Sequence, residues 1–148
     1  MKLHKPTITD FTNAVHSHTN DAGGGIISVG APVIIWSVPG TLVANTTVSP
    51  CCKFYVPFNC TAVAVYLSVT ACPTGSSLIT VDIHYDGTTI WTTQGNRPTI
   101  ALNAYTGTVI AFNTTAFVAG KLLEMFVDTV GGTIAGAFLT VELKVSIP

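Results

Sequence analysis

Charged residues are scarce in this sequence. They make up 9% of its 148 residues, whereas ordinary soluble domains contain about 25%. Six lysines and arginines are balanced by seven aspartates and glutamates, without a basic cluster, so we expect no nucleic-acid partner. The net charge of -1 also gives little repulsion between copies of the chain, which favours a sizeable subunit interface.

Long apolar runs are absent as well. No run approaches the roughly 18 residues that a membrane-spanning helix needs, so we expect no membrane insertion. The basic residues at 1–6 are not followed by an apolar core, and we therefore expect no signal peptide and synthesis in a cytoplasm.

The cysteine spacing argues against a zinc site. Cys51 and Cys52 are adjacent, and neither Cys60 nor Cys72 completes a CxxC pattern. In a reducing cytoplasm we expect all four to be buried thiols. A Cys60–Cys72 disulfide is the alternative for a particle that ends up outside a cell.

Short strands separated by turn residues dominate the chain from residue 26 onward. The 23 threonines favour strands over helices, and glycine and proline fall between the apolar segments. The pattern predicts an all-β fold, a single β-sandwich of jelly-roll type over 26–148. A short extended or helical N-terminal arm is predicted over 1–25.

Two segments alternate most clearly between apolar and polar residues. The residues predicted to face the core from the strand at 61–70 are Val63, Val65, Leu67 and Val69. Those predicted to do so from the last strand are Leu139, Val141, Leu143 and Val145. Glu142 and Lys144 then face solvent. Asp86-Gly87 predicts a hairpin, because a type I′ turn requires positive φ at both central residues.

The predicted arm contains a pair of histidines, His16 and His18. In an extended backbone, residues two apart point to the same side, so the two imidazoles reach toward one point, with Asp21 as the nearest oxygen donor. One chain supplies too few ligands, whereas three copies on an axis supply six nitrogens. The spacing is compatible with iron, zinc or nickel. The alternative is a pair of solvated histidines in a linker.

Recognisable catalytic motifs are absent. The sequence has no G-x-S-x-G, H-E-x-x-H or P-loop pattern. Asp82, His84 and Asp86 share one strand face, which suits an acid–base group or a cation site. Turn chemistry already explains Asp86, and we expect Asp82 and His84 to face solvent. We therefore predict that the chain is not an enzyme.

Aromatic residues provide a candidate binding site. Tyrosine and tryptophan rings can stack on sugar rings, because they offer an apolar face with a polar tip. Trp91 follows the predicted hairpin and Tyr105 lies in a Thr/Asn/Gly-rich loop, and these two are the predicted glycan-binding residues. Packing in the core or at a subunit interface is expected for most other aromatic residues.

Short motifs spread over nearly the whole chain carry a family resemblance. The segment Ile8-Thr9-Asp10-Phe11, His16-Ser17-His18 and Asp21-Ala22-Gly23-Gly24-Gly25 is similar to a segment in virion proteins of tailed bacteriophages, where an H-x-H pair lies on the intertwined trimeric stem of a tail fibre. The later motifs resemble small β-sandwich domains at the ends of phage fibres. They are Val56-Pro57-Phe58, Pro73-Thr74-Gly75, Asp86-Gly87-Thr88-Thr89-Ile90, Arg97-Pro98-Thr99-Ile100 and Ala135-Gly136-Ala137-Phe138-Leu139-Thr140-Val141. The resemblance implies one divalent transition metal ion per trimer, held by His16 and His18.

Together, the residues and the resemblance predict a bacteriophage structural protein located in the virion. We expect a homotrimeric tail fibre or spike component, attached to other virion proteins through its arm. Its exposed sandwich is expected to bind host-surface carbohydrate. One alternative is a capsid decoration protein, a cement or head-fibre component that stabilises the shell, and a more remote one is a glycan-active enzyme.

Overall fold

Two antiparallel sheets make up the domain in the computed structural model, which describes residues 31–44 and 50–148. Sheet A contains β1 (Val33–Thr41), β10 (Ala137–Ser146), β3 (Cys60–Ser68) and β7 (Thr106–Val109) in that order, and β8 (Ala116–Phe117) pairs with β3. Sheet B contains β2 (Cys52–Tyr55), β9 (Leu122–Thr129), β4 (Ile79–Tyr85) and β5 (Thr88–Thr89), and β6 (Thr99–Ile100) pairs with β4. The predicted arm at 1–25 lies outside the described residues.

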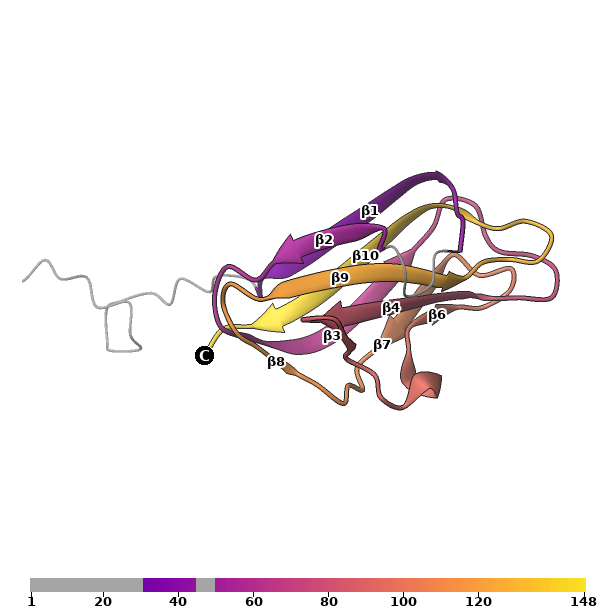
Figure 1. Cartoon of the computed structure of the whole chain (residues 1–148). Helices are drawn as coiled ribbons and strands as arrows, with labels where there is room; N and C mark the ends of the chain where they lie inside the picture. The colour runs from indigo at the N-terminus through magenta and orange to yellow at the C-terminus, as the bar shows by residue number, and fades with distance from the viewer. Residues whose placement is uncertain (1–30, 45–49) are drawn as a thin grey trace, which may run out of the picture. The chain divides into compact units, whose positions relative to one another are not determined.

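The predicted all-β sandwich is confirmed. The first four strands alternate between the sheets, and each sheet interleaves early strands with late ones, which gives the strand order of a jelly roll. Figure 1 shows the two layers. The only helical element in the described part is the 3₁₀ turn η2 (Gln94–Asn96), and no helix there is long and apolar enough to span a membrane.

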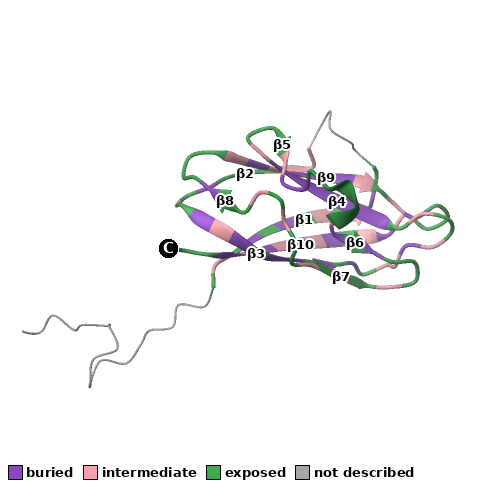
Figure 2. Ribbon diagram, turned by 90° about the horizontal axis from the view of Figure 1, so that it is seen from below, coloured by how far each residue is buried: buried purple, intermediate pink, exposed green. Residues whose placement is uncertain are grey.

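The core lies between the two sheets. Every predicted core residue of the last strand, Leu139, Val141, Leu143 and Val145, has no exposed surface, while Glu142 and Lys144 are half-exposed between them. Opposite them, sheet B contributes the apolar side chains of β4 and β9, and Figure 2 shows buried stretches along both strands. The alternation predicted for β10 is therefore confirmed.

The prediction for β3 is correct at one end and wrong at the other. Val65 and Leu67 are buried, but Val63 is 41% exposed and Ala64 is buried in its place. The register with β10 shifts between Lys144 and Val145, opposite this point. A bulge of this kind inserts a residue and moves the side chains beyond it to the other face.

The β4–β5 hairpin has the turn that its sequence predicts. His84 pairs with Thr89 and Tyr85 with Thr88, which leaves Asp86 and Gly87 as the two loop residues. Their φ angles are +51° and +82°, both positive, as a type I′ turn requires.

The cysteines agree only in part with the prediction of buried thiols. Cys60 is buried, and burial raises the pKa of its thiol. Cys51, Cys52 and Cys72 are half-buried. Cys60 and Cys72 are not bridged to each other.

Candidate functional site

The two ends of the sandwich differ in what they present. At one end, the Val145 N–H donates a hydrogen bond to the Pro32 carbonyl at 2.9 Å, so the first and last described residues lie close together. The ion pair of Lys121 and Asp86 lies at the same end of the sandwich. We call this the entry end. The opposite end, which we call the loop end, is built from the connections at 69–78, 101–105 and 130–136 (Figure 1).

Backbone hydrogen bonds tie the connections of the loop end together. The Thr74 N–H donates to the Ile134 carbonyl at 3.0 Å, and the Asn103 N–H donates to the Pro73 carbonyl at 2.9 Å. At Gly131, an added Cβ would lie 1.8 Å from the Ile134 carbonyl oxygen, so the loops approach too closely there for any side chain. The loop end is therefore a packed surface rather than a set of separate loops.

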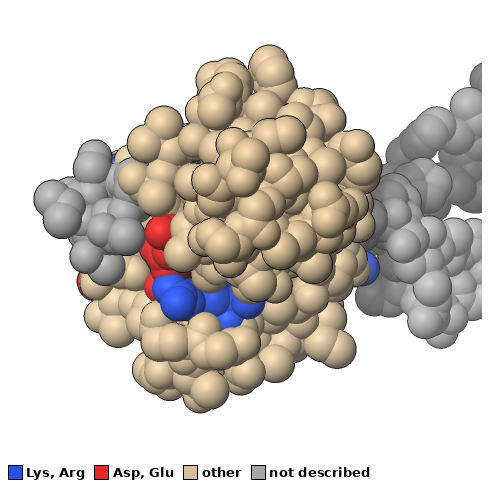
Figure 3. All heavy atoms as spheres, turned by 90° about the vertical axis from the view of Figure 1, so that its right-hand side faces the viewer, with Lys and Arg blue, Asp and Glu red and all other residues tan. Residues whose placement is uncertain are grey.

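The connections of the loop end carry no charged residue. Figure 3 looks at this end and shows uncharged residues across most of it, with one small patch of charged side chains. Large apolar or aromatic side chains are exposed here: Leu102 at 40%, Tyr105 at 55%, Ile134 at 51% and Phe138 at 55%. A surface of this composition suits contact with an uncharged ligand or with another protein.

The structure places Tyr105 on the loop end, with more than half of its surface exposed. Its carbonyl accepts a hydrogen bond from the Val69 N–H at 2.9 Å, which fixes its backbone beside the end of β3. A hydrogen bond with the Cys72 side chain, together with the charge of that group, raises the pKa of the Tyr105 hydroxyl. Tyr105 is thus an anchored aromatic ring with an accessible face.

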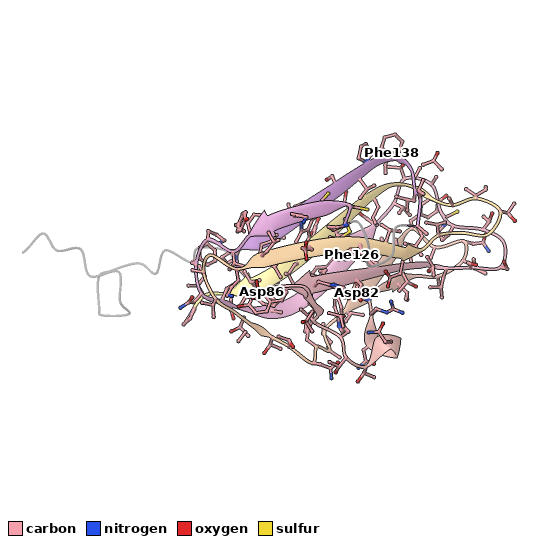
Figure 4. All side chains as sticks on the ribbon, in the orientation of Figure 1. Asp82, Asp86, Phe126 and Phe138 are labelled. Atoms are coloured by element: carbon pink, nitrogen blue, oxygen red, sulfur yellow. The ribbon has the colours of Figure 1, made fainter. Side chains whose placement is uncertain are left out.

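Phe138 is a second exposed ring at the loop end, labelled in Figure 4. Its φ angle is +53°, in the left-handed region that costs a residue with a Cβ roughly 1–2 kcal/mol. The cause is an irregular pairing in which Val38 faces Leu139 but Thr41 faces Ala137. Sequence reasoning did not single out Phe138, because a bulge of this kind has no simple sequence pattern.

Trp91 does not occupy the surface position that the glycan prediction requires. It has no exposed surface, its indole Nε1–H donates to the Ala111 carbonyl at 2.8 Å, and its ring stacks on Phe112 with centroids 5.5 Å apart. A ring covered on all sides cannot stack on a sugar. Trp91 is a core residue, and the glycan prediction is corrected at this position.

Asp82 and His84 point away from the core but do not face solvent, contrary to the prediction. They are only 4% and 9% exposed, with the His84 Nε2 and an Asp82 carboxylate oxygen 3.4 Å apart. Asp82 also accepts a hydrogen bond from the Thr89 hydroxyl at 2.7 Å. Phe126, which pairs with Asp82 across β4 and β9, lies beside them (Figure 4), with its ring 4.5 Å from that of His84.

Neighbouring side chains on the outer face of sheet B explain why these outward positions are buried: Thr89 and Phe126 contact them directly. Arg97 lies in the connection that follows the edge of β4, and its side chain reaches past β4 to form an ion pair with Asp128 near the end of β9. Burial raises the pKa of Asp128, although the charge of Arg97 opposes the rise. We infer that this polar cluster fastens the connection to the sheet.

The predicted metal ligands, His16 and His18, lie outside the described residues. In residues 31–44 and 50–148, no group of three or more histidine, cysteine or acidic side chains is arranged to hold a metal ion.

Comparison with known proteins identified no relative of this chain. No protein-family model matches the sequence, and no curated protein is significantly similar to it.

Proposed function

We propose that this chain is a homotrimeric structural protein of a bacteriophage virion, of the tail-fibre or spike type. Its arm attaches it to the particle, and its loop end faces outward and binds host-surface glycan. The observation that carries the proposal is the division of the domain into two ends. The chain enters the sandwich at the entry end, while the loop end, whose connections carry no charged residue, presents Tyr105 on the opposite side.

The fold and the composition support a role in a particle. Jelly rolls are common in viral capsid proteins and lectin domains, which is an analogy at the level of fold. Only 9% of the residues are charged, as expected of a subunit that functions in an assembly. Three copies of one weak sugar site, presented together, bind a repetitive surface more strongly than one copy does.

Tyr105→Ala should weaken binding to host cells or to purified host polysaccharide by at least about tenfold, because it removes a stacking platform from all three copies. The measurement is a titration of labelled protein against cells or polysaccharide. Tyr55→Ala is the matched control, since Tyr55 is also exposed, at 71%, but lies near the entry end. Equal binding by both variants would remove Tyr105 from the proposed site.

His16→Ala combined with His18→Ala should remove the bound metal and lower the melting temperature of the trimer, because the imidazoles of three chains are the proposed ligands. Elemental analysis and thermal unfolding of the full chain measure the two effects. Unchanged metal content would eliminate the site from the proposal.

A capsid decoration protein is the second candidate. The observation in its favour is the pair of exposed aliphatic residues, Leu102 and Ile134, on the loop end, because such side chains suit a contact with a shell protein as well as a contact with sugar. Electron microscopy of labelled particles distinguishes the two candidates by locating the chain on the tail or on the head.

A further inference from the structure

The outer face of sheet A is partly apolar although it points away from the core. In the middle of this face, Glu142 on β10 pairs with Ile35 of β1 on one side and with Tyr66 of β3 on the other. Ile35 is 58% exposed and Tyr66 is 42% exposed. Val33, next but one to Ile35, is 44% exposed. We call the outward side chains of β1, β10, β3 and β7 the β10 face.

Two charged side chains stand in the middle of this face, Glu142 and Lys144. They are two residues apart on β10 and therefore point to the same side, about 7 Å apart along the strand. Neither forms an ion pair within the described part of the chain. All other charged side chains described do so, in the pairs Lys53–Glu124, Asp82–His84, Arg97–Asp128 and Lys121–Asp86.

We propose that the β10 faces of the three copies meet around the threefold axis, with Glu142 of each copy paired with Lys144 of the next. The inference rests on the proposed homotrimer and identifies the surface that forms it. Each copy carries one unpaired anion and one unpaired cation on this face, so in a closed ring of three every Glu142 can pair with the Lys144 of a neighbouring copy. The apolar residues on both sides of this charge pair would be buried in the interface, and removing their surface from water favours association.

The size and shape of the face fit a contact between subunits. From the spacing of strands and the rise per residue, it measures roughly 20 Å by 30 Å, which is close to what one partner contributes to a standard protein interface. Shallow hollows on this face accept protruding side chains. One of about 340 Å³ is lined by residues that include Tyr66, Ser68, Thr108 and Glu142.

The charge pair determines how the copies align. Burying a lone carboxylate or ammonium group in an interface is costly, whereas a matched pair offsets much of that cost. A register in which Glu142 meets Glu142 is therefore excluded, and the register in which Glu142 meets Lys144 is selected.

Charge reversal tests the pairing in the full chain. Glu142→Lys and Lys144→Glu each place like charges on all copies, and each should raise the chain concentration needed for half-assembly at least about tenfold. The double variant restores opposite charges and should return assembly to within about threefold of the wild type. Analytical ultracentrifugation over a range of chain concentrations measures this. Assembly by both single variants at the wild-type concentration overturns the proposal, and so does failure of the double variant to recover while it remains folded by circular dichroism.

A zero-length carbodiimide cross-link provides the second measurement. It should join the Glu142 carboxylate of one copy to the Lys144 amine of another, as identified by mass spectrometry of mixed isotope-labelled chains. Lys144→Arg keeps the charge and should assemble without this link. Assembly of the wild type without any Glu142–Lys144 link between chains overturns the proposal.

The apolar part of the face has its own matched pair of variants. Ile35→Glu should dissociate the assembly, whereas Val118→Glu should not, because Val118 is exposed to a similar degree, 54%, but lies outside the β10 face. Equal assembly by the two variants contradicts the proposal.

The same experiments separate this inference from the proposed function. If the wild type is a trimer and the charge variants assemble equally well, the β10 face is not the interface, and the proposed trimer still stands. If the wild type is a dimer and the charge variants weaken its assembly, the β10 face is the interface, and the threefold assembly is contradicted. A wild-type monomer contradicts both.

Discussion

Trp91→Ala should lower the free energy of unfolding by about 3–5 kcal/mol, the cost of removing a large aromatic side chain from a core. Trp91 has no exposed surface and stacks on Phe112. Its indole N–H is the partner of the Ala111 carbonyl, which would lose a hydrogen bond as well. Urea denaturation at one fixed chain concentration measures the change, because the stability of an assembly depends on concentration.

Tyr105→Ala is the control for this prediction. Tyr105 was assigned the same role as Trp91 from the sequence, but it is 55% exposed, so its removal should change the free energy of unfolding by no more than about 0.5 kcal/mol. Comparable losses in the two variants would show that the assignment of Trp91 to the core and Tyr105 to the surface is wrong.

Gly107→Ala should lower the free energy of unfolding by about 3 kcal/mol, the upper part of the usual cost of overpacking. A Cβ added at Gly107 would lie 1.9 Å from the carbonyl oxygen of Thr99 and 3.5 Å from the Ile100 side chain. The nearest obstacle is backbone, so a change of rotamer cannot relieve it, and β6 and β7 must move apart. Denaturation of the purified variant measures the loss.

Gly95→Ala makes the same chemical change where space is open. An added Cβ at Gly95 meets no atom within 4 Å, and its φ angle is not positive. The free energy of unfolding should therefore stay within about 0.5 kcal/mol of the wild-type value. A large loss at Gly95, or none at Gly107, would contradict the close approach of β6 and β7.

Strict alternation in the sequence predicted the strands that keep a regular register. The inward side of β10 was identified without error from Leu139 to Val145, because each strand residue there alternates between the core and the outside. The hairpin turn at Asp86-Gly87 was also predicted correctly, because a type I′ turn depends only on the positive φ angles of its two central residues. Both cases depend only on neighbours in the sequence.

Prediction failed where distant segments determine burial. Val63 was assigned to the core because the sequence does not show the register shift opposite Lys144. Asp82 and His84 were assigned to solvent because nothing in the strand indicates that Thr89 and Phe126, from neighbouring strands, pack against them. Trp91 was assigned to the surface for the same reason, since its cover comes from Ala111 and Phe112, some twenty residues away.

Only part of the candidate site could be predicted from the sequence. Tyr105 was identified from its polar, glycine-containing surroundings, and the structure exposes it at the loop end. The apolar part of the β10 face was missed, although the signal was present. If Ile34 and Trp36 face the core, strand alternation requires Val33 and Ile35 to face outward.

The mass of the full-length chain in solution tests the central claim most directly. Native mass spectrometry combined with metal analysis should give three times the 15.5 kDa of one chain, with one transition metal ion bound per three chains. A metal-free particle of 15.5 kDa at micromolar concentration would contradict the account.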